Sequence, residues 1–114
     1  MDTKDQLHMP AATQELANRR AKLAPDTYKA WREFNKAVFA EGALDSKTKE
    51  LIAVAVAHVT QCAYCIQSHT KNARRKGATA EELMEAIWVA AEMRAGGAYA
   101  HSLVALDTYD DMPD

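Results

Sequence analysis

Three residues that can perform thiol chemistry, Cys62, Cys65 and His69, lie close together near the middle of the chain. In a helix, side chains three and four positions apart lie on neighbouring turns of one face, so these groups would meet. The two sulfurs would be close enough for a disulfide. A helix that starts near position 61 would place both sulfurs in its first turn, where the partial positive charge of the N-terminus favours the thiolate.

A thiolate pair beside an imidazole is what a thiol peroxidase requires. One sulfur attacks the peroxide and becomes a sulfenic acid, and the other resolves it. His69 is placed to accept the thiol proton and to return one to a leaving oxygen. Glu50, eleven residues before Cys62, could orient the imidazole. On one straight helix Glu50 and Cys62 would be about 18 Å apart, so the chain must bend near Thr60 or form two helices that turn back on each other.

Composition favours a single soluble domain over residues 1–114, with residues 1–10 frayed. The net charge of -2 and pI near 6.1 argue against a nucleic-acid partner. The longest apolar run, 51–57, is far shorter than the roughly 20 residues of a membrane helix, so we expect no membrane partner. The polar N-terminus lacks a signal peptide, which predicts a cytoplasmic protein. Cysteines in that compartment are kept reduced, so a close pair is more often redox-active or metal-binding than structural.

The patterning predicts an all-α fold, a compact bundle of about six helices, because no segment alternates with period two. Caps, prolines and glycines set the expected boundaries. The first expected helix covers 11–22, and the second begins at Pro25 and ends before Gly42. The third is capped by Asp45 or Ser46, and the fourth covers 61–76. The fifth begins at the capping box Thr79–Glu82, and the sixth follows Gly96–Gly97. The run 51–57 is apolar all round, which predicts burial on every side.

The spacing of Glu50, Cys62, Cys65 and His69 resembles the motif of the AhpD-like alkylhydroperoxidases, within the carboxymuconolactone decarboxylase family. The similarity covers roughly residues 25–106. It implies Cys65 as the peroxidatic cysteine, Cys62 as the resolving one, and Glu50 with His69 as a proton relay. It also implies a hydroperoxide substrate, organic more than inorganic, and an external dithiol reductant, lipoyl-like or thioredoxin-like. We expect neither a cofactor nor a metal.

Two departures from the founding pattern of that family bear on activity and assembly. Tyr64 occupies the position immediately before the second cysteine, where the founding pattern has a histidine. A phenol is a poorer base near neutral pH, which predicts a shorter relay and slower turnover. This chain has one helical unit where the founding member has two, so assembly must supply the second. The resemblance implies a homo-oligomer, a hexamer built as a trimer of dimers.

Other interpretations stay open on the sequence alone. The cysteines could be two buried small side chains. Zinc could bind His58, Cys62, Cys65 and His69, but these would spread over about 16 Å of one helix, so a kink or a second chain would be needed. By function, the rivals are a non-catalytic redox switch or assembly protein and a lactone-acting decarboxylase of the same family.

The remaining histidines and the aromatic residues are given structural roles. His58 and His101 are interpreted as satisfied or interface histidines, and His8 as part of the frayed terminus. The aromatic side chains interpreted as core or subunit contacts are Trp31, Phe34, Phe39 and Trp88.

Overall fold

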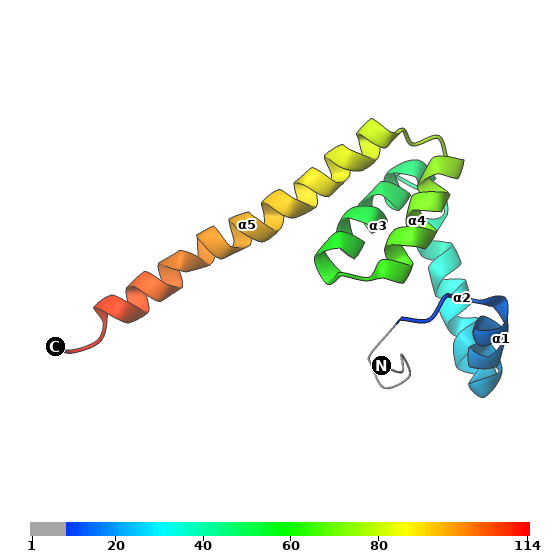
Figure 1. Cartoon of the computed structure of the whole chain (residues 1–114), viewed down its shortest axis with the longest axis horizontal. Helices are drawn as coiled ribbons and strands as arrows, with labels where there is room; N and C mark the ends of the chain where they lie inside the picture. Colours follow the sequence, from blue (N-terminus) through cyan, green and yellow to red (C-terminus); the bar gives the residue numbers. More distant parts are fainter. Residues whose placement is uncertain (1–8) are drawn as a thin grey trace, which may run out of the picture. The chain divides into compact units, whose positions relative to one another are not determined.

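The computed structural model describes residues 9–114, which form five helices and no strand (Figure 1). The all-α prediction is confirmed. Most of the segment expected to be frayed, and His8 within it, lies outside the described residues. The chain divides into two compact units, one up to Val38 and one from Phe39 to Asp114.

The first unit contains α1 (Gln14–Leu23) and most of α2 (Pro25–Phe39). Thr13 caps α1, since its hydroxyl accepts the Leu16 N–H at 3.2 Å, and α2 begins at Pro25 as predicted. The rings of Trp31 and Phe34 lie 6.0 Å apart, and both side chains are largely exposed.

The second unit contains α3 (Ser46–Thr60), α4 (Ala63–Arg75) and α5 (Ala80–Asp110). The helix α3 packs against both α4 and α5 (Figure 1). The buried apolar side chains of the described residues are small, which lets the helix backbones approach closely; they are Val54, Ala57, Ala73 and Ala90. This unit holds all four residues of the motif.

Helix ends follow the predicted capping chemistry. Asp45 caps α3, its carboxylate accepting the Thr48 N–H at 2.7 Å. At the start of α5 the Thr79 hydroxyl accepts the Glu82 N–H, and the Glu82 carboxylate accepts the Thr79 N–H. Gly77, after the last turn of α4, has a positive φ of 95°, which glycine adopts without steric penalty.

The expected helix break at Gly96–Gly97 is wrong, so five helices replace the six expected. The helix α5 runs unbroken through both glycines to Asp110. A glycine inside a helix costs only about 1 kcal/mol relative to alanine, and α5 contains no proline to remove a backbone hydrogen bond.

The prediction that the run 51–57 is buried on every side is also wrong for the chain by itself. Val54 and Ala57 are buried, whereas Ile52 and Val56 are 47% and 52% exposed. The reason is that α3 has close helical neighbours on only part of its circumference. None of the helices in residues 9–114 is both long enough and apolar enough to span a bilayer.

The N-termini of α3 and α5 are joined by an ion pair whose strength depends on pH. The Lys47 Nζ lies 2.7 Å from the Glu82 Oε2. This hydrogen bond from Lys47, with that from the Thr79 N–H, holds the pKa of Glu82 below its ordinary value. A carboxylate with a lowered folded-state pKa stabilises the fold above its unfolded pKa, and that contribution is lost as the pH falls through the folded pKa.

We therefore predict that Glu82→Gln lowers the melting temperature at neutral pH, by an amount that shrinks to nothing in acid. Thermal melts of both proteins across the acid range measure this difference. Glu81→Gln is the matched control, because it removes a charge from the same first turn of α5 without touching Lys47. A Glu82→Gln deficit that stays constant with pH would contradict the assignment.

Candidate active site

The two-residue connection between α3 and α4 makes the bend that the motif requires. Gln61 adopts the left-handed conformation, with φ 57° and ψ 48°, which is uncommon for a residue with a Cβ. The Ala57 carbonyl then accepts both the Gln61 N–H and the Cys62 N–H, the latter at 3.0 Å, which closes the end of α3. The chain reverses here, so α4 returns along α3 (Figure 1).

This reversal brings Glu50 on α3 against His69 on α4. The Glu50 Oε2 lies 2.6 Å from the His69 Nδ1. Glu50 is only 5% exposed, and a buried carboxylate requires a polar partner. Because an ionised carboxylate can only accept, the Nδ1 carries the hydrogen and donates it. The second ring nitrogen, Nε2, is then left as the basic atom when the imidazole is neutral.

The imidazole also has an aromatic neighbour that sequence reasoning missed. The Phe39 ring stacks on His69, with ring centroids 4.9 Å apart and planes inclined by 25°. Phe39 is the last residue of α2, thirty positions before His69. Nothing in the spacing of the sequence links Phe39 to the motif, so the sequence predicts only a core or subunit contact for it.

Cys62 and Cys65 form a disulfide, with their Cα atoms 5.2 Å apart, inside the usual range for such bonds. Cys62 is the N-cap of α4, and its Sγ accepts the Cys65 N–H at 3.2 Å. Both sulfurs therefore lie at the positive end of the helix, as the sequence predicted. The cysteine sulfur performs the task that a serine or aspartate oxygen performs in other helices.

The helix α4 places His69, the partner of Glu50, one turn after Cys65. His69 follows Cys65 by four positions within α4, which sets their Cβ atoms about 5–6 Å apart. The structure thus places a carboxylate, an imidazole and a cysteine pair in sequence along two neighbouring helices. Tyr64, between the two cysteines, lies in the first turn of α4 and is 38% exposed.

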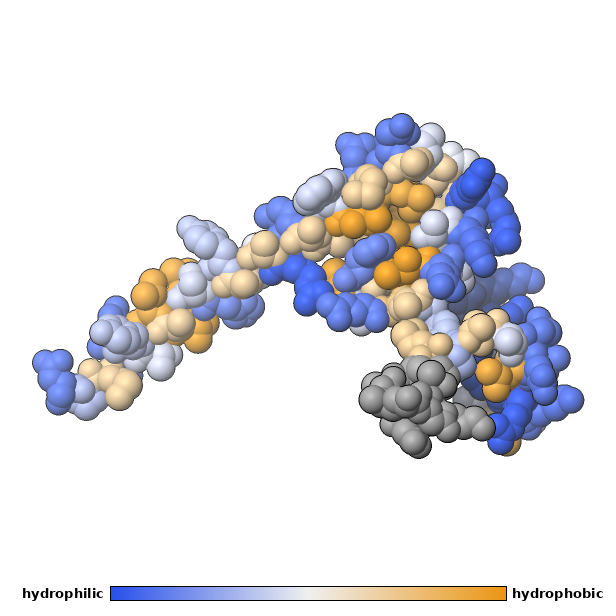
Figure 2. All heavy atoms as spheres, viewed as in Figure 1, coloured by the Kyte–Doolittle hydropathy of each residue, from blue (hydrophilic) through white to orange (hydrophobic). Residues whose placement is uncertain are grey.

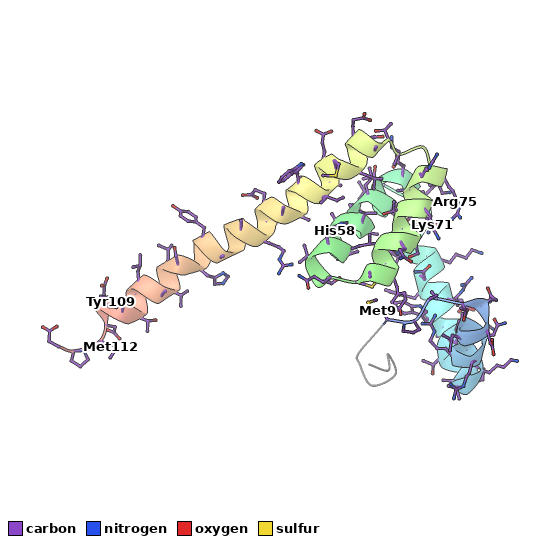
Figure 3. All side chains as sticks on the ribbon, viewed as in Figure 1. Met9, His58, Lys71, Arg75, Tyr109 and Met112 are labelled. Carbon is purple, nitrogen blue, oxygen red and sulfur yellow. A yellow bond between two sulfur atoms is a disulfide. The ribbon has the colours of Figure 1, made fainter. Side chains whose placement is uncertain are left out.

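The other two described histidines bond within their own helices. The His58 Nδ1 lies 2.8 Å from the Val54 carbonyl on α3 (Figure 3), and the His101 Nδ1 lies 2.9 Å from the Gly97 carbonyl on α5. Within residues 9–114, no group of three or more His, Cys, Asp or Glu side chains is arranged to hold a metal ion.

The capping role of Cys62 yields a prediction about stability in the reduced protein. Serine at position 62 keeps an acceptor for the Cys65 N–H and alanine does not, so Cys62→Ala should be less stable than Cys62→Ser by about 1 kcal/mol. Urea denaturation in the presence of a reductant measures the difference. At position 65, inside the helix, the order should reverse, because alanine is the better helix former. Equal stabilities of the two position-62 variants would contradict a stabilising role of the cap at Cys62.

Three comparisons place this chain among known proteins. The family model for the carboxymuconolactone decarboxylase family matches residues 25–108. A Paracoccus denitrificans protein, named uncharacterized protein 4 in the cox locus, is 57% identical over 107 residues, which cover 93% of this chain and 95% of the relative.

Solved structures agree with these sequence matches. A carboxymuconolactone decarboxylase family protein from Legionella pneumophila, solved in its apo form, is 33% identical with a TM-score of 0.68, over 85% of this chain and 87% of that one. A family member from Thermotoga maritima, for which a part in the antioxidative response has been suggested, is 27% identical with a TM-score of 0.54, over 73% of this chain and 95% of that one. The resemblance inferred from the motif is confirmed, and the chain belongs to the carboxymuconolactone decarboxylase family.

Proposed function

We propose that this chain is a thiol peroxidase that reduces hydroperoxides, organic ones above all, by cycling between a dithiol and the Cys62–Cys65 disulfide. The observation that carries the proposal is the buried Glu50–His69 hydrogen bond, one helical turn from that disulfide. A carboxylate that orients an imidazole beside a thiol is the arrangement of an activated nucleophile.

In the first step the Cys65 thiol gives its proton to His69, directly or through water, and the thiolate attacks the terminal oxygen of the hydroperoxide. A sulfur–oxygen bond forms and the oxygen–oxygen bond breaks. The departing alkoxide takes a proton from the imidazolium and leaves as an alcohol. Cys65 is then a sulfenic acid, and Glu50, still hydrogen-bonded to the Nδ1, has stabilised the imidazolium between the two transfers.

In the second step the Cys62 thiolate attacks the sulfenic sulfur. The sulfur–sulfur bond forms, the sulfur–oxygen bond breaks, and the hydroxide leaves as water with the proton that the Cys62 thiol gave up. The disulfide between Cys62 and Cys65 supports this step, because it is the bond that the step would form. An external dithiol, lipoyl-like or thioredoxin-like, returns it to the reduced form by thiol–disulfide exchange, becoming a disulfide itself.

The family relationship supports the proposed peroxidase activity. An antioxidative role has been suggested for the Thermotoga maritima family member, which is the context in which a peroxidase acts. The lactone-acting branch of the family does not depend on a cysteine pair. The presence of Cys62 and Cys65 next to a basic residue, His69, therefore favours the peroxidase. Reactivity that survives loss of both cysteines would favour the decarboxylase-type alternative.

The deciding experiment counts free thiols in the reduced protein after one equivalent of cumene hydroperoxide is added. We expect both thiols to disappear together and much faster than free cysteine reacts. Cys65→Ser should abolish sulfenic acid formation, and Cys62→Ser should trap the sulfenic acid, which dimedone labels for mass spectrometry. Thiols that persist, or that decay at the rate of free cysteine, would contradict the peroxidase and leave the redox switch in its place.

The proton relay is tested in the same assay with the pair of variants Glu50→Gln and His69→Ala. Both should slow thiol loss by about 10²-fold or more, since general acid–base catalysis is typically worth 10²–10⁴-fold. Circular dichroism checks that each variant keeps its helices. Unchanged rates of thiol loss in both variants would show that Glu50 and His69 form no proton relay. If the sulfenic acid is instead trapped in Cys65→Ser and absent in Cys62→Ser, the two cysteines have the opposite roles.

We also propose that the chain assembles as a homo-oligomer. The C-terminal half of α5 stands apart from the other helices of its unit and carries an apolar surface (Figure 2). Tyr99, Leu103 and Leu106 follow one another at spacings of four and three, so they share one face of the helix. Tyr99 is 82% exposed. Large contiguous apolar surfaces indicate interaction sites. Because the family resemblance implies a homo-oligomer, we propose that a second copy of the chain binds this face.

Light scattering after size exclusion tests the assembly. The expected mass is that of a hexamer of the 12.6 kDa chain. Leu103→Glu should reduce the mass, because a charge buried in an interface is costly. Lys71→Glu, at an exposed position on α4 (Figure 3), is the matched control and should leave the mass unchanged. A wild-type protein that stays monomeric at every concentration would contradict the assembly.

A further inference from the structure

We propose that Phe39 is a positioning residue for the proton relay. Its ring holds the imidazole of His69 in the plane that keeps the Nδ1 on Glu50 and turns the Nε2 away from that carboxylate. The inference deepens the proposed function and depends on it for its catalytic meaning, but the positioning itself can be measured without any peroxide.

A single hydrogen bond leaves an imidazole with considerable freedom. The Glu50 Oε2 fixes one ring atom, the Nδ1, at 2.6 Å, but the ring can still turn about that contact and about its own side-chain bonds. The His69 side chain keeps 20% of its surface exposed, so water can compete for the ring nitrogens. A second contact is needed to fix the plane of the ring. Phe39 supplies it, with centroids 4.9 Å apart and planes inclined by 25°.

Phe39 is itself held in register with Glu50 by the chain on either side. The Lys49 Nζ donates to the Ala40 carbonyl at 2.6 Å. Lys49 precedes Glu50 on α3, and Ala40 follows Phe39 at the end of α2. One turn of α3 therefore anchors the backbone beside the stacking ring and presents the carboxylate that the imidazole binds.

The stacking geometry also suits the charge that His69 must carry. After it accepts a thiol proton the ring is a cation, and a cation within about 6 Å of an aromatic face is attracted by the negative quadrupole of that face. An aliphatic side chain of the same size would fill the space but would offer no such attraction. Aromatic pairs of this geometry are worth more than their buried area alone.

The test compares Phe39→Leu with Phe39→Tyr, which keeps the ring. In the reduced protein, ¹⁵N chemical shifts of the His69 ring nitrogens at mildly alkaline pH report which nitrogen carries the hydrogen. Wild type and Phe39→Tyr should show the single form protonated at the Nδ1, and Phe39→Leu a mixture of both. Thiol loss with cumene hydroperoxide should slow roughly two- to tenfold in Phe39→Leu and recover in Phe39→Tyr.

The matched control is Phe34→Leu, which removes another aromatic ring from α2, one that pairs with Trp31. It should change neither readout. If Phe39→Leu does not fold, Phe39→Met takes its place in the test, because it also removes the ring and has a similar volume. A single Nδ1-protonated form and an unchanged rate in the ring-less variant would overturn the inference. If wild-type thiols do not react with the hydroperoxide, the proposed function fails, and the nitrogen shifts still decide whether Phe39 positions the ring.

Discussion

The hydrogen bond between Glu50 and His69 is the interaction on which the rest of the site depends. A carboxylate that is 5% exposed is stable only beside a partner that satisfies it, and its partner comes from another helix, nineteen residues along the chain. The contact therefore sets the register of α4 against α3. Because Cys65 lies one turn before His69 on the same helix, that register also determines where the sulfurs lie relative to the base.

The N-terminus of α4 combines a structural and a chemical role in one side chain. Cys62 caps the helix through its sulfur and is also one half of the disulfide. Oxidation and reduction thus act directly on the group that begins α4. If the pair cycles as proposed, each turn of the cycle changes the group that begins the helix carrying His69.

The parts of the site that lie on one helix follow from the helical repeat, whereas the Glu50–His69 pair between two helices is predicted only with the family resemblance and on condition of a bend. The helical repeat alone places Cys62, Cys65 and His69 on neighbouring turns, and the caps at Asp45 and Thr79 follow from side-chain chemistry. The reversal falls at Gln61, next to the bend expected near Thr60, but its left-handed conformation could not be predicted because no glycine marks the residue.

Contacts between distant segments explain the remaining differences. The stacking of Phe39 on His69 depends on how the end of α2 meets α4, which local spacing does not encode. The continuity of α5 through Gly96 and Gly97 reflects a modest local penalty that the rest of a 31-residue helix outweighs. The apolar side chains left exposed on α3 and α5 reflect how few helices of the unit pack against them.

The two-residue connection between α3 and α4 has a consequence for how this sequence can vary in length. If α4 began at the same point in space, one residue more or fewer there would shift each of its side chains by one helical position, about 100° around the axis. His69 would turn away from Glu50, and the sulfurs would turn with it. Loops elsewhere in a protein usually tolerate insertions, tags and new chain ends. We expect this connection to be an exception, so the number of residues between Glu50 and His69 is as much a part of the proposed site as the residues themselves.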